Sequence, residues 1–360
     1  MKISILQENL AKAALTISKI VSSRPQLPIL ANILLKAEKG KIVFLATDLS
    51  ISMGLTIGGK IEEDGEIAIP AKEFSALISQ LAAGRVDLSS EKDSLSVRSG
   101  SFKARLVGVS GGEFPKAESP SGRGLEIKSE DLSFLLKRTV FAAAKDDSRP
   151  VLTGIKLSES GKGEIKAIAT DGYRLSVVTV PAGGSIDGTA IVPSRFLSEA
   201  DKFSEAAGIN LSISKSGEAG VVGEAGWLSG RTIAGEFPPA EKIIPQTFDL
   251  TISVNRSELE RAVKIATIFA RSASNIIKWE IKSGKLKVSA NSPQIGENET
   301  TLEVEGKGEG EMAFNGRYLL DYLGSTDEEA INFSMIDSLK PGVFKSKNYL
   351  HVIMPVRVQK

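Results

Sequence analysis

Apolar residues recur every three or four positions in two stretches that lie near opposite ends of the chain. This spacing places them on one face of a helix, so we predict helices there. Other stretches alternate apolar and polar residues, as at 41–46 and 285–288, which predicts strands with one buried face. The residues with helical spacing are Leu10, Ala14, Ile17 and Val21 in the first stretch and Leu259, Val263, Ala266 and Ala270 in the second.

The chain repeats itself. Residues 111–118 read GGEFPKAE and residues 234–241 read AGEFPPAE, 123 positions later. Several matches at nearly one offset indicate an internal repeat. The other matched pairs are ATD at 46–48 and 169–171, Pro70 and Pro193, which suit first helical turns, and Arg-Pro at 24–25 and 149–150.

A third copy is fainter, because it lacks the Arg-Pro and Phe-Pro motifs. It is recognised from equivalent positions in all three copies. Leu10, Leu132 and Leu259 each lie early in a first helix, and Lys72, Arg195 and Arg317 each lie two residues into a second helix. We therefore predict three tandem α+β domains, each with two helices on antiparallel strands. The predicted bounds are 1–122, 123–248 and 249–360, with linkers at 119–124 and 244–247.

Composition narrows the class of protein. The net charge is +1, which argues against a tight DNA-groove reader. There is no cysteine and one histidine, His351, which we interpret as a strand residue. No metal-ligand cluster, phosphate-binding loop or nucleophile elbow is found, so neither cofactor nor metal is expected. The N-terminus MKISILQENL does not resemble a signal peptide and no membrane span is expected, so a cytoplasmic location is predicted.

Cations recur on the predicted outer faces of the first helices. Two interpretations remain open, a solvated surface and a weak phosphate-contacting face. The residues are Lys12 and Lys19, Arg138 and Lys145, and Arg261, Lys264 and Arg271.

Several longer segments resemble one family. RPVLTGIKL, ATDGYRL, GEFPPAEKIIP, FNGRYLLDYL and the ending YLHVIMPVR are similar, in this order, to the beta subunit of bacterial DNA polymerase III, the sliding clamp. The resemblance covers essentially the whole chain. It implies a non-catalytic processivity factor, a head-to-tail homodimer, and duplex DNA, the replicative polymerase, a clamp loader and other clamp-binding peptides as partners.

Size favours two chains per ring. A domain of this length approximates a bead about 35 Å across. Three touching beads leave a hole of about 5 Å and six leave about 35 Å, whereas duplex DNA is roughly 20 Å wide. A dimer is therefore needed to surround DNA, and its contact joins unlike ends of the chain.

The resemblance also implies DNA contacts. Arg149, Pro150 and Val151 occupy a loop that touches DNA in the family, although Asp146 and Asp147 precede it and a plain turn is an alternative. The predicted DNA-binding residues are Arg24, Lys72, Arg149, Pro150, Val151, Arg195 and Arg317.

A groove for partner peptides is implied between the second and third domains. Apolar side chains and an adaptable methionine suit varied ligands, whereas a closing core strand is the alternative for the chain end. Tyr173 stands where the family often has histidine. The predicted groove residues are Leu152, Thr170, Gly172, Tyr173, Arg174, Leu175, Pro238, Ile243, Val352, Ile353, Met354, Pro355, Val356 and Arg357.

For the subunit interface, the resemblance implies that Ile268 and Phe269 meet Ala104 and Leu106, with core packing as the alternative. Two other functions remain open. One is an enzyme that uses Asp48 or Asp171 with Arg174, which the duplicated ATD argues against because it suggests a structural turn. The other is a repeat scaffold that binds proteins without encircling DNA.

Overall fold

The computed structural model describes residues 1–22, 25–120, 124–146, 148–161, 163–186, 188–203, 208–272 and 274–357. Arg24 and Asp147 lie outside the described residues. The chain forms two compact units, each treated by itself. The first unit comprises residues 1–129, 184–187 and 199–232, and the second comprises 130–183, 188–198 and 233–360.

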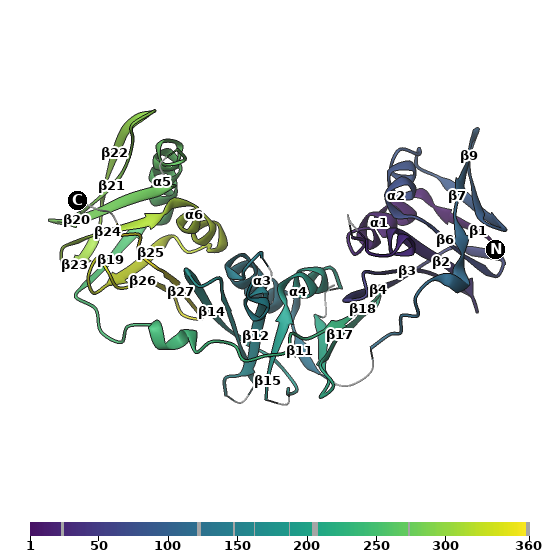
Figure 1. Cartoon of the computed structure of the whole chain (residues 1–360), viewed down its shortest axis with the longest axis horizontal. Coiled ribbons are helices and arrows are strands. Elements are labelled where there is room, and N and C mark those ends of the chain that lie inside the picture. The colour runs from purple at the N-terminus through teal and green to yellow at the C-terminus, as the bar shows by residue number, and fades with distance from the viewer. Residues whose placement is uncertain are drawn as a thin grey trace. The chain divides into compact units, whose positions relative to one another are not determined.

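The first unit contains two sheets and a helix pair (Figure 1). One sheet has the strand order β5-β1-β7-β8-β9, and the other has the order β10-β6-β2-β3-β4-β18-β17-β16-β11. Its elements are β1 (Lys2–Leu6), α1 (Gln7–Ile17), η1 (Pro28–Ala31), β2 (Asn32–Glu38), β3 (Lys41–Thr47), β4 (Ile51–Ile57), β5 (Lys60–Glu63), β6 (Gly65–Pro70), α2 (Ala71–Ser79), β7 (Arg85–Glu91), β8 (Ser94–Ser99), β9 (Phe102–Val107), β10 (Val109–Ser110), η2 (Gly111–Glu113), β11 (Leu125–Ile127), η5 (Asp201–Phe203), β16 (Ile209–Ile213), β17 (Glu218–Gly223) and β18 (Gly226–Arg231).

The second unit also contains two sheets, ordered β15-β12-β13-β14-β27-β26-β25-β19-β23 and β22-β21-β20-β24, together with the four helices α3 to α6. Helices α3 and α4 extend one or two residues beyond its bounds. Its elements are α3 (Ser129–Thr139), η3 (Val140–Ala142), η4 (Pro150–Thr153), β12 (Gly154–Glu159), β13 (Glu164–Thr170), β14 (Arg174–Pro181), β15 (Thr189–Pro193), α4 (Ser194–Ala200), η6 (Ala240–Ile243), β19 (Leu250–Asn255), α5 (Arg256–Ala270), β20 (Ile276–Lys282), β21 (Lys285–Ser292), β22 (Gly296–Glu303), β23 (Glu305–Lys307), β24 (Gly310–Asn315), α6 (Gly316–Ser325), β25 (Ala330–Met335), β26 (Gly342–Lys345) and β27 (Tyr349–Ile353).

The predicted helices and strands are found, but the stripe predicted for the first helix extends too far, because Val21 lies beyond the end of α1. Leu10, Ala14 and Ile17 are buried on α1, while the whole predicted apolar stripe of α5 is buried against its sheet. Asn255 caps α5 because its side-chain oxygen accepts the Glu258 N–H at 3.1 Å. Helices α2 and α4 begin directly after Pro70 and Pro193, as the proline positions predicted.

Two strand ladders join neighbouring repeats. In the first unit β4 pairs with β18, and in the second unit β14 pairs with β27. We call these ladders the first seam and the second seam. Leu228 lies opposite Met53 in the first, and His351 lies opposite Ser176 in the second. Ser176 follows Met53 by 123 positions, and His351 follows Leu228 by the same number. The two seams therefore join equivalent strands of the repeat.

The two strands that would make a third seam are unpaired on one side. β9 takes the place of β18 and β27 at the end of its repeat, and β22 takes the place of β4 and β14. Both are end strands of their sheets among the described residues. An end strand presents unsatisfied N–H and C=O groups, so these two edges can accept another strand.

Candidate partner groove and subunit edges

An apolar layer crosses the second seam. Leu175 of β14, Val352 of β27 and Val343 of β26 lie opposite one another in neighbouring strands and are buried together. Further apolar side chains that are only partly buried pack against this layer. They are Val151, Val177, Ile233, Ala240, Ile244 and Leu350, together with Ala144 and Phe248. The combination of a buried floor and half-covered apolar residues is what an apolar ligand site requires.

Polar and exposed residues border this layer. The chain continues beyond β27 in an extended form, because the Met354 N–H donates to the Tyr173 carbonyl and the Val356 N–H donates to Ala313, both at 2.8 Å. Tyr173 is 60% exposed and Ile243 is 44% exposed. Met354, Pro355 and Val356 are half-buried, whereas Pro238 and Arg357 are exposed. This extended end therefore supplies accessible side chains beside the apolar layer.

Arg174 is buried and contacts several elements of the second unit. Its guanidinium donates to Asp171 at 3.0 Å and to Asp321 at 2.6 Å, and it lies 4.5 Å from the centre of the Tyr318 ring. Burial raises the pKa of the Tyr318 phenol, which therefore stays neutral beside the cation. With its donors directed at protein acceptors, Arg174 positions β14 and its neighbours.

Most of the remaining predicted groove residues are buried, and three of them, Leu152, Leu175 and Val352, belong to the apolar layer. Leu152, Leu175, Val352 and Ile353 are buried, as is Thr170. Gly172 adopts a φ of +92°, and a side chain built there would lie 3.4 Å from the Arg149 guanidinium. The core-strand interpretation thus describes Ile353, while the residues after it lie in extended chain.

The equivalent place in the first seam is occupied. Ser52, Ser229 and Gly220 stand where the second seam has Leu175, Val352 and Val343. The linker residue Pro120 lies where a Gly220 side chain would point, and the Trp227 ring lies over Gly54. Small polar residues, a proline and a tryptophan therefore replace the apolar layer in the first seam.

The two ATD motifs form structural turns, as predicted. The Thr47 hydroxyl accepts the Leu49 N–H and donates to the Ile51 carbonyl, and Asp48 accepts the backbone N–H groups of Ser50 and Ile51. In the second copy Thr170 and Asp171 make the equivalent bonds. The enzyme hypothesis needs Asp48 or Asp171 as an acid or base. These hydrogen bonds argue against it, because the carboxylate oxygens accept backbone N–H groups and hold the turns.

Three predicted DNA-contact cations occupy one repeated position. The second residues of α2, α4 and α6 are Lys72, Arg195 and Arg317, respectively, and all three are exposed. Cations near a helix N-terminus are unfavourable to the helix dipole, so helix stability does not account for them.

The loop after α3 carries the other predicted contacts. Arg149 and Pro150 are exposed and Val151 is half-buried. Asp146 accepts hydrogen bonds from the Ser148 hydroxyl and backbone N–H, and these hold the pKa of its carboxyl below its usual range. Arg149 therefore lies beside Gly172 and an anionic turn.

One sequence expectation about the helix faces is wrong. Arg138 does not lie on an exposed cationic stripe but is buried, 3.6 Å from the centre of the Phe134 ring and 3.7 Å from Asp327. Its ion-pair partner is 189 positions away in the sequence, so helical periodicity alone places it wrongly. Lys12, Arg261 and Lys264 are exposed as expected, and Lys264 pairs with Glu260. The expectation is also wrong for Lys19, Lys145 and Arg271, because they follow the last residues of α1, α3 and α5.

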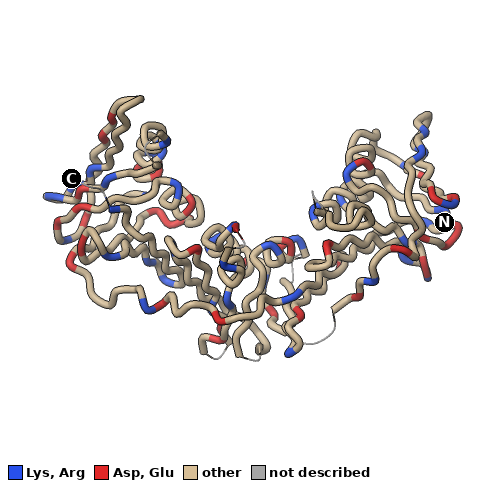
Figure 2. The backbone as a smooth tube through the Cα atoms, viewed as in Figure 1, with Lys and Arg blue, Asp and Glu red and all other residues tan. Residues whose placement is uncertain are grey.

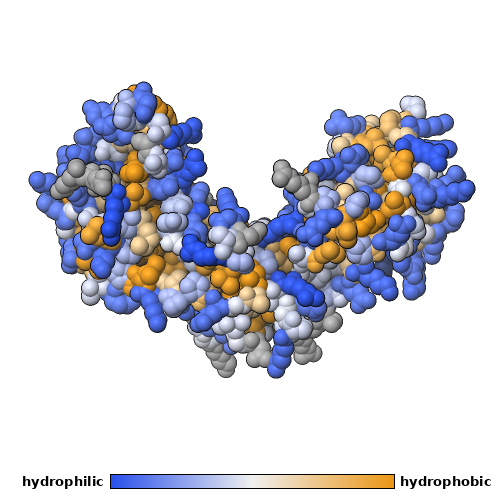
Figure 3. Space-filling view, in the orientation of Figure 1, coloured by the Kyte–Doolittle hydropathy of each residue, from blue (hydrophilic) through white to orange (hydrophobic). Residues whose placement is uncertain are grey.

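The predicted subunit-interface residues are accessible. Ala104 and Leu106 lie half-buried on β9, and Phe102 on the same face is 38% exposed. On α5, Ile268 is 58% exposed and Phe269 is half-buried. Figure 3 shows hydrophobic surface where α5 and the β21–β22 hairpin lie, at the upper left. Core packing therefore does not explain Ile268.

Within the described part of the chain, no group of three or more His, Cys, Asp or Glu residues could hold a metal ion. No helix there is long and apolar enough to cross a membrane.

Three repeats of two helices on antiparallel strands, joined by strand pairing, define the DNA-clamp class of fold. Family models for the N-terminal, central and C-terminal domains of the DNA polymerase III beta subunit match residues 1–118, 126–239 and 241–357. The chain belongs to this family. The membership confirms the prediction of a sliding clamp, a non-catalytic subunit of the polymerase.

Individual proteins of this family are similar to the chain in sequence and in fold. The chain is 29% identical to the beta sliding clamp of Chlamydia pneumoniae over 364 residues, which cover 99% of both chains. The beta subunit of Thermotoga maritima superposes with a TM-score of 0.92 at 24% identity over 99% of this chain and 100% of that one, a likeness of fold. The sliding clamp of Bartonella birtlesii, solved bound to griselimycin, has a TM-score of 0.92 at 27% identity, with 99% and 100% covered.

Sequence reasoning missed several residues of the second seam. Val343 was not predicted, because its place in the apolar layer depends on its pairing with Val352 of the neighbouring strand. Asp321 and Tyr318, which hold Arg174, lie on α6 and carry no local signal, because their contacts join repeats far apart in the sequence.

Proposed function

We propose that two copies of this chain close head to tail into a ring around duplex DNA and tether the replicative polymerase to it. The unpaired edges of β9 and β22 carry this proposal. Each repeat junction within the chain is a ladder between equivalents of these two strands. A second copy supplies the missing strand to each edge, and two such contacts close the ring.

Weak phosphate contacts suit this function. The net charge of +1 does not favour tight DNA binding, and a ring holds DNA by topology. We assign the repeated cations Lys72, Arg195 and Arg317, with Lys12 on α1, to transient contacts with phosphates. Arg149 is assigned to the rim of the partner groove as well, since its guanidinium lies beside Gly172.

We assign the second seam as the groove for polymerase, clamp loader and other clamp-binding peptides. Its apolar layer supports this assignment, as does the absence of such a layer in the first seam. Tyr173, Met354, Pro355 and Val356 are the residues best placed to meet a ligand, and the buried Leu175 and Val352 support them from below. The domain bounds at 122 and 248 and a cytoplasmic location belong to the same proposal.

The ring is tested by its retention on DNA of two shapes. The protein, loaded by its clamp loader, should remain on nicked circular DNA and leave the same DNA after it is cut to a linear form. Gel filtration of the labelled protein with DNA separates the two outcomes. Equal loss from both forms would favour the scaffold that binds proteins without encircling DNA, because a topological link exists only on the circle.

A further inference from the structure

A pocket lies in the first unit, between α1 and the strands of the first seam. It has a volume of about 440 Å³ and is lined by side chains of α1 between residues 9 and 16, by residues 55–58 at the end of β4, by Lys202 of η5, and by Ala225 in the turn before β18. Figure 1 shows α1 against β4 in this unit. We call this space the first-seam pocket. Its size is that of a site for a small organic ligand, which typically has about 300–1,000 Å³.

The strand side of the first-seam pocket differs from its counterpart in the second seam. Leu55 lies opposite Gly226 in the first seam. At positions 123 later, Val178 lies opposite Tyr349 in the second seam. Gly226 therefore has no side chain at the position where the second seam has a buried phenol ring.

The helix side differs in the same direction. Helices α1 and α3 are equivalent, and their first buried leucines lie 122 positions apart, so Lys12 and Thr16 correspond to Phe134 and Arg138. The Arg138 guanidinium lies 3.6 Å from the centre of the Phe134 ring and 5.7 Å from that of Tyr349. These three side chains pack together in the second seam. The first seam has a short threonine and an exposed lysine in their place, so a pocket remains there.

The floor of the first-seam pocket is aliphatic. Ala13 of α1 and Leu55 of β4 are buried, and Ile57 is half-buried. None of the described residues that line the pocket is aromatic. An alkyl chain therefore matches this floor better than a ring does, because a ring would find no partner for stacking.

The rim of the pocket is cationic. Lys12 is exposed and makes no ion pair within the part of the chain that the structure describes, whereas Lys202 pairs with Glu199. No carboxylate is among the described lining residues. Two lysines and one paired glutamate leave one net positive charge, which matches a ligand with a single anionic group.

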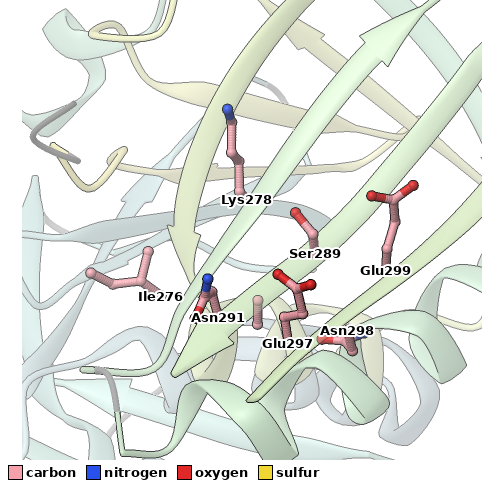
Figure 4. Close-up of a pocket in the computed structure, with 8 residues that line it drawn as sticks. Ile276, Lys278, Ser289, Asn291, Glu297, Asn298 and Glu299 are labelled. Carbon is pink, nitrogen blue, oxygen red and sulfur yellow. The ribbon is translucent and has the colours of Figure 1, made fainter. Parts of the chain in front are cut away.

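A second hollow has the opposite charge. It lies on the sheet of β20, β21 and β22, has a volume of about 600 Å³, and has Glu297, Glu299 and Lys278 among its side chains (Figure 4). Acidic residues lie along β22 (Figure 2), and Lys278 is paired with Glu311 at 2.8 Å. This hollow repels anions, so the first-seam pocket is the better site for an anionic ligand.

We propose that the first-seam pocket binds a free aliphatic carboxylate of medium chain length. The alkyl chain lies on Ala13, Leu55 and Ile57, where each methylene leaves water. The carboxylate accepts a charge-assisted hydrogen bond from Lys12, the cation that we also assign to phosphate contacts. All lining residues belong to the first unit, so the site does not rest on the proposed ring.

Saturation-transfer NMR with octanoate tests the pocket, because titration of the ligand yields a dissociation constant even for weak binding. The two methylenes that octanoate has beyond hexanoate should tighten binding about 15-fold, about fourfold each. 1-Octanol has the same chain without the charge and should bind about tenfold more weakly than octanoate.

Three variants locate the ligand. Lys12→Met keeps an unbranched side chain and removes the charge, so octanoate should bind about tenfold more weakly while 1-octanol is unaffected. Thr16→Phe places a ring in the pocket and should weaken both ligands at least about tenfold, since the alkyl chain loses its place. Lys41→Met, the matched control, removes an exposed lysine of β3 that does not line the pocket and should change neither affinity.

Thermal unfolding shows whether Thr16→Phe is folded, and Lys12→Met, at an exposed position, keeps the test independent of that variant. No saturable binding of octanoate to the wild type, or equal binding to the wild type and to both pocket variants, overturns the site. Equal affinity of the wild type for octanoate and 1-octanol overturns the contact between the carboxylate and Lys12. None of these results bears on the proposed ring, because retention on circular DNA is measured separately.

Discussion

At the scale of single residues, burial changes the protonation of His351. It is fully buried, stacks on Tyr322 at 5.1 Å between ring centres, and its Nδ1 lies 2.9 Å from the Ser176 hydroxyl across the second seam. Burial lowers its pKa to about 3, and the nearby Arg174 charge acts in the same direction. The prediction of a strand residue is confirmed, because His351 lies in β27.

This environment makes the second seam sensitive to acid. The unfolded chain binds a proton at His351 below about pH 6.5, whereas the folded chain does so only near pH 3, so stability is present at neutral pH and is lost as pH falls. Between pH 6.5 and 5 the loss is about 2 kcal/mol. Urea unfolding at the two pH values measures it, and His351→Leu, which copies Leu228 of the first seam, should remove this part of the pH dependence. An unchanged difference between pH values in the variant would contradict the assignment.

At the scale of helices and strands, periodicity predicts most of what is observed. The stripe on α5 and the alternation in β3 and β21 are local signals, because one element contains all the residues involved. The seams are not local. Pairing of Trp227 with Gly54 joins residues 173 positions apart, and only the repeat offset relates it to the pairing of Leu350 with Val177. The groove was therefore predicted from the resemblance rather than from the pattern of residues.

The first seam depends on a glycine. A Cβ atom on Gly54 would lie 2.4 Å from the Trp227 ring, so Gly54→Ala forces the ring away from β4. Overpacking of this kind should lower the free energy of unfolding by about 1–3 kcal/mol. Thermal unfolding and the emission spectrum of Trp227 report both effects, since the other tryptophan, Trp279, is in the core of the second unit.

The matched control for this seam is Gly58→Ala. Gly58 is exposed just beyond the end of β4, with no atom within 4 Å of a built Cβ. It should unfold with the wild type and keep the wild-type emission. If both variants were equally stable, the contact between Trp227 and Gly54 would not hold the seam.

At the scale of the whole molecule, one repeat forms two seams that differ in their side chains, and it leaves two free strand edges. The backbone ladder is common to the seams, whereas the side chains on one face differ. They are apolar and in part accessible in the second seam, and small or covered by Trp227 and Pro120 in the first. Because the covered site leaves no room for a ligand, each chain should hold one peptide groove rather than two.

The number of grooves per chain can be measured with a small ligand. Griselimycin, the ligand in the Bartonella birtlesii clamp structure, is the probe for this experiment. Isothermal titration calorimetry should give one molecule bound per chain. Met354→Ala removes a half-buried side chain beside the apolar layer and should weaken binding about tenfold, as truncation of a ligand anchor does. Arg231→Ala changes the equivalent position of the first seam and should leave affinity unchanged. Two molecules per chain, or equal effects of the two substitutions, would mean that the first seam also binds and that its covering residues move aside.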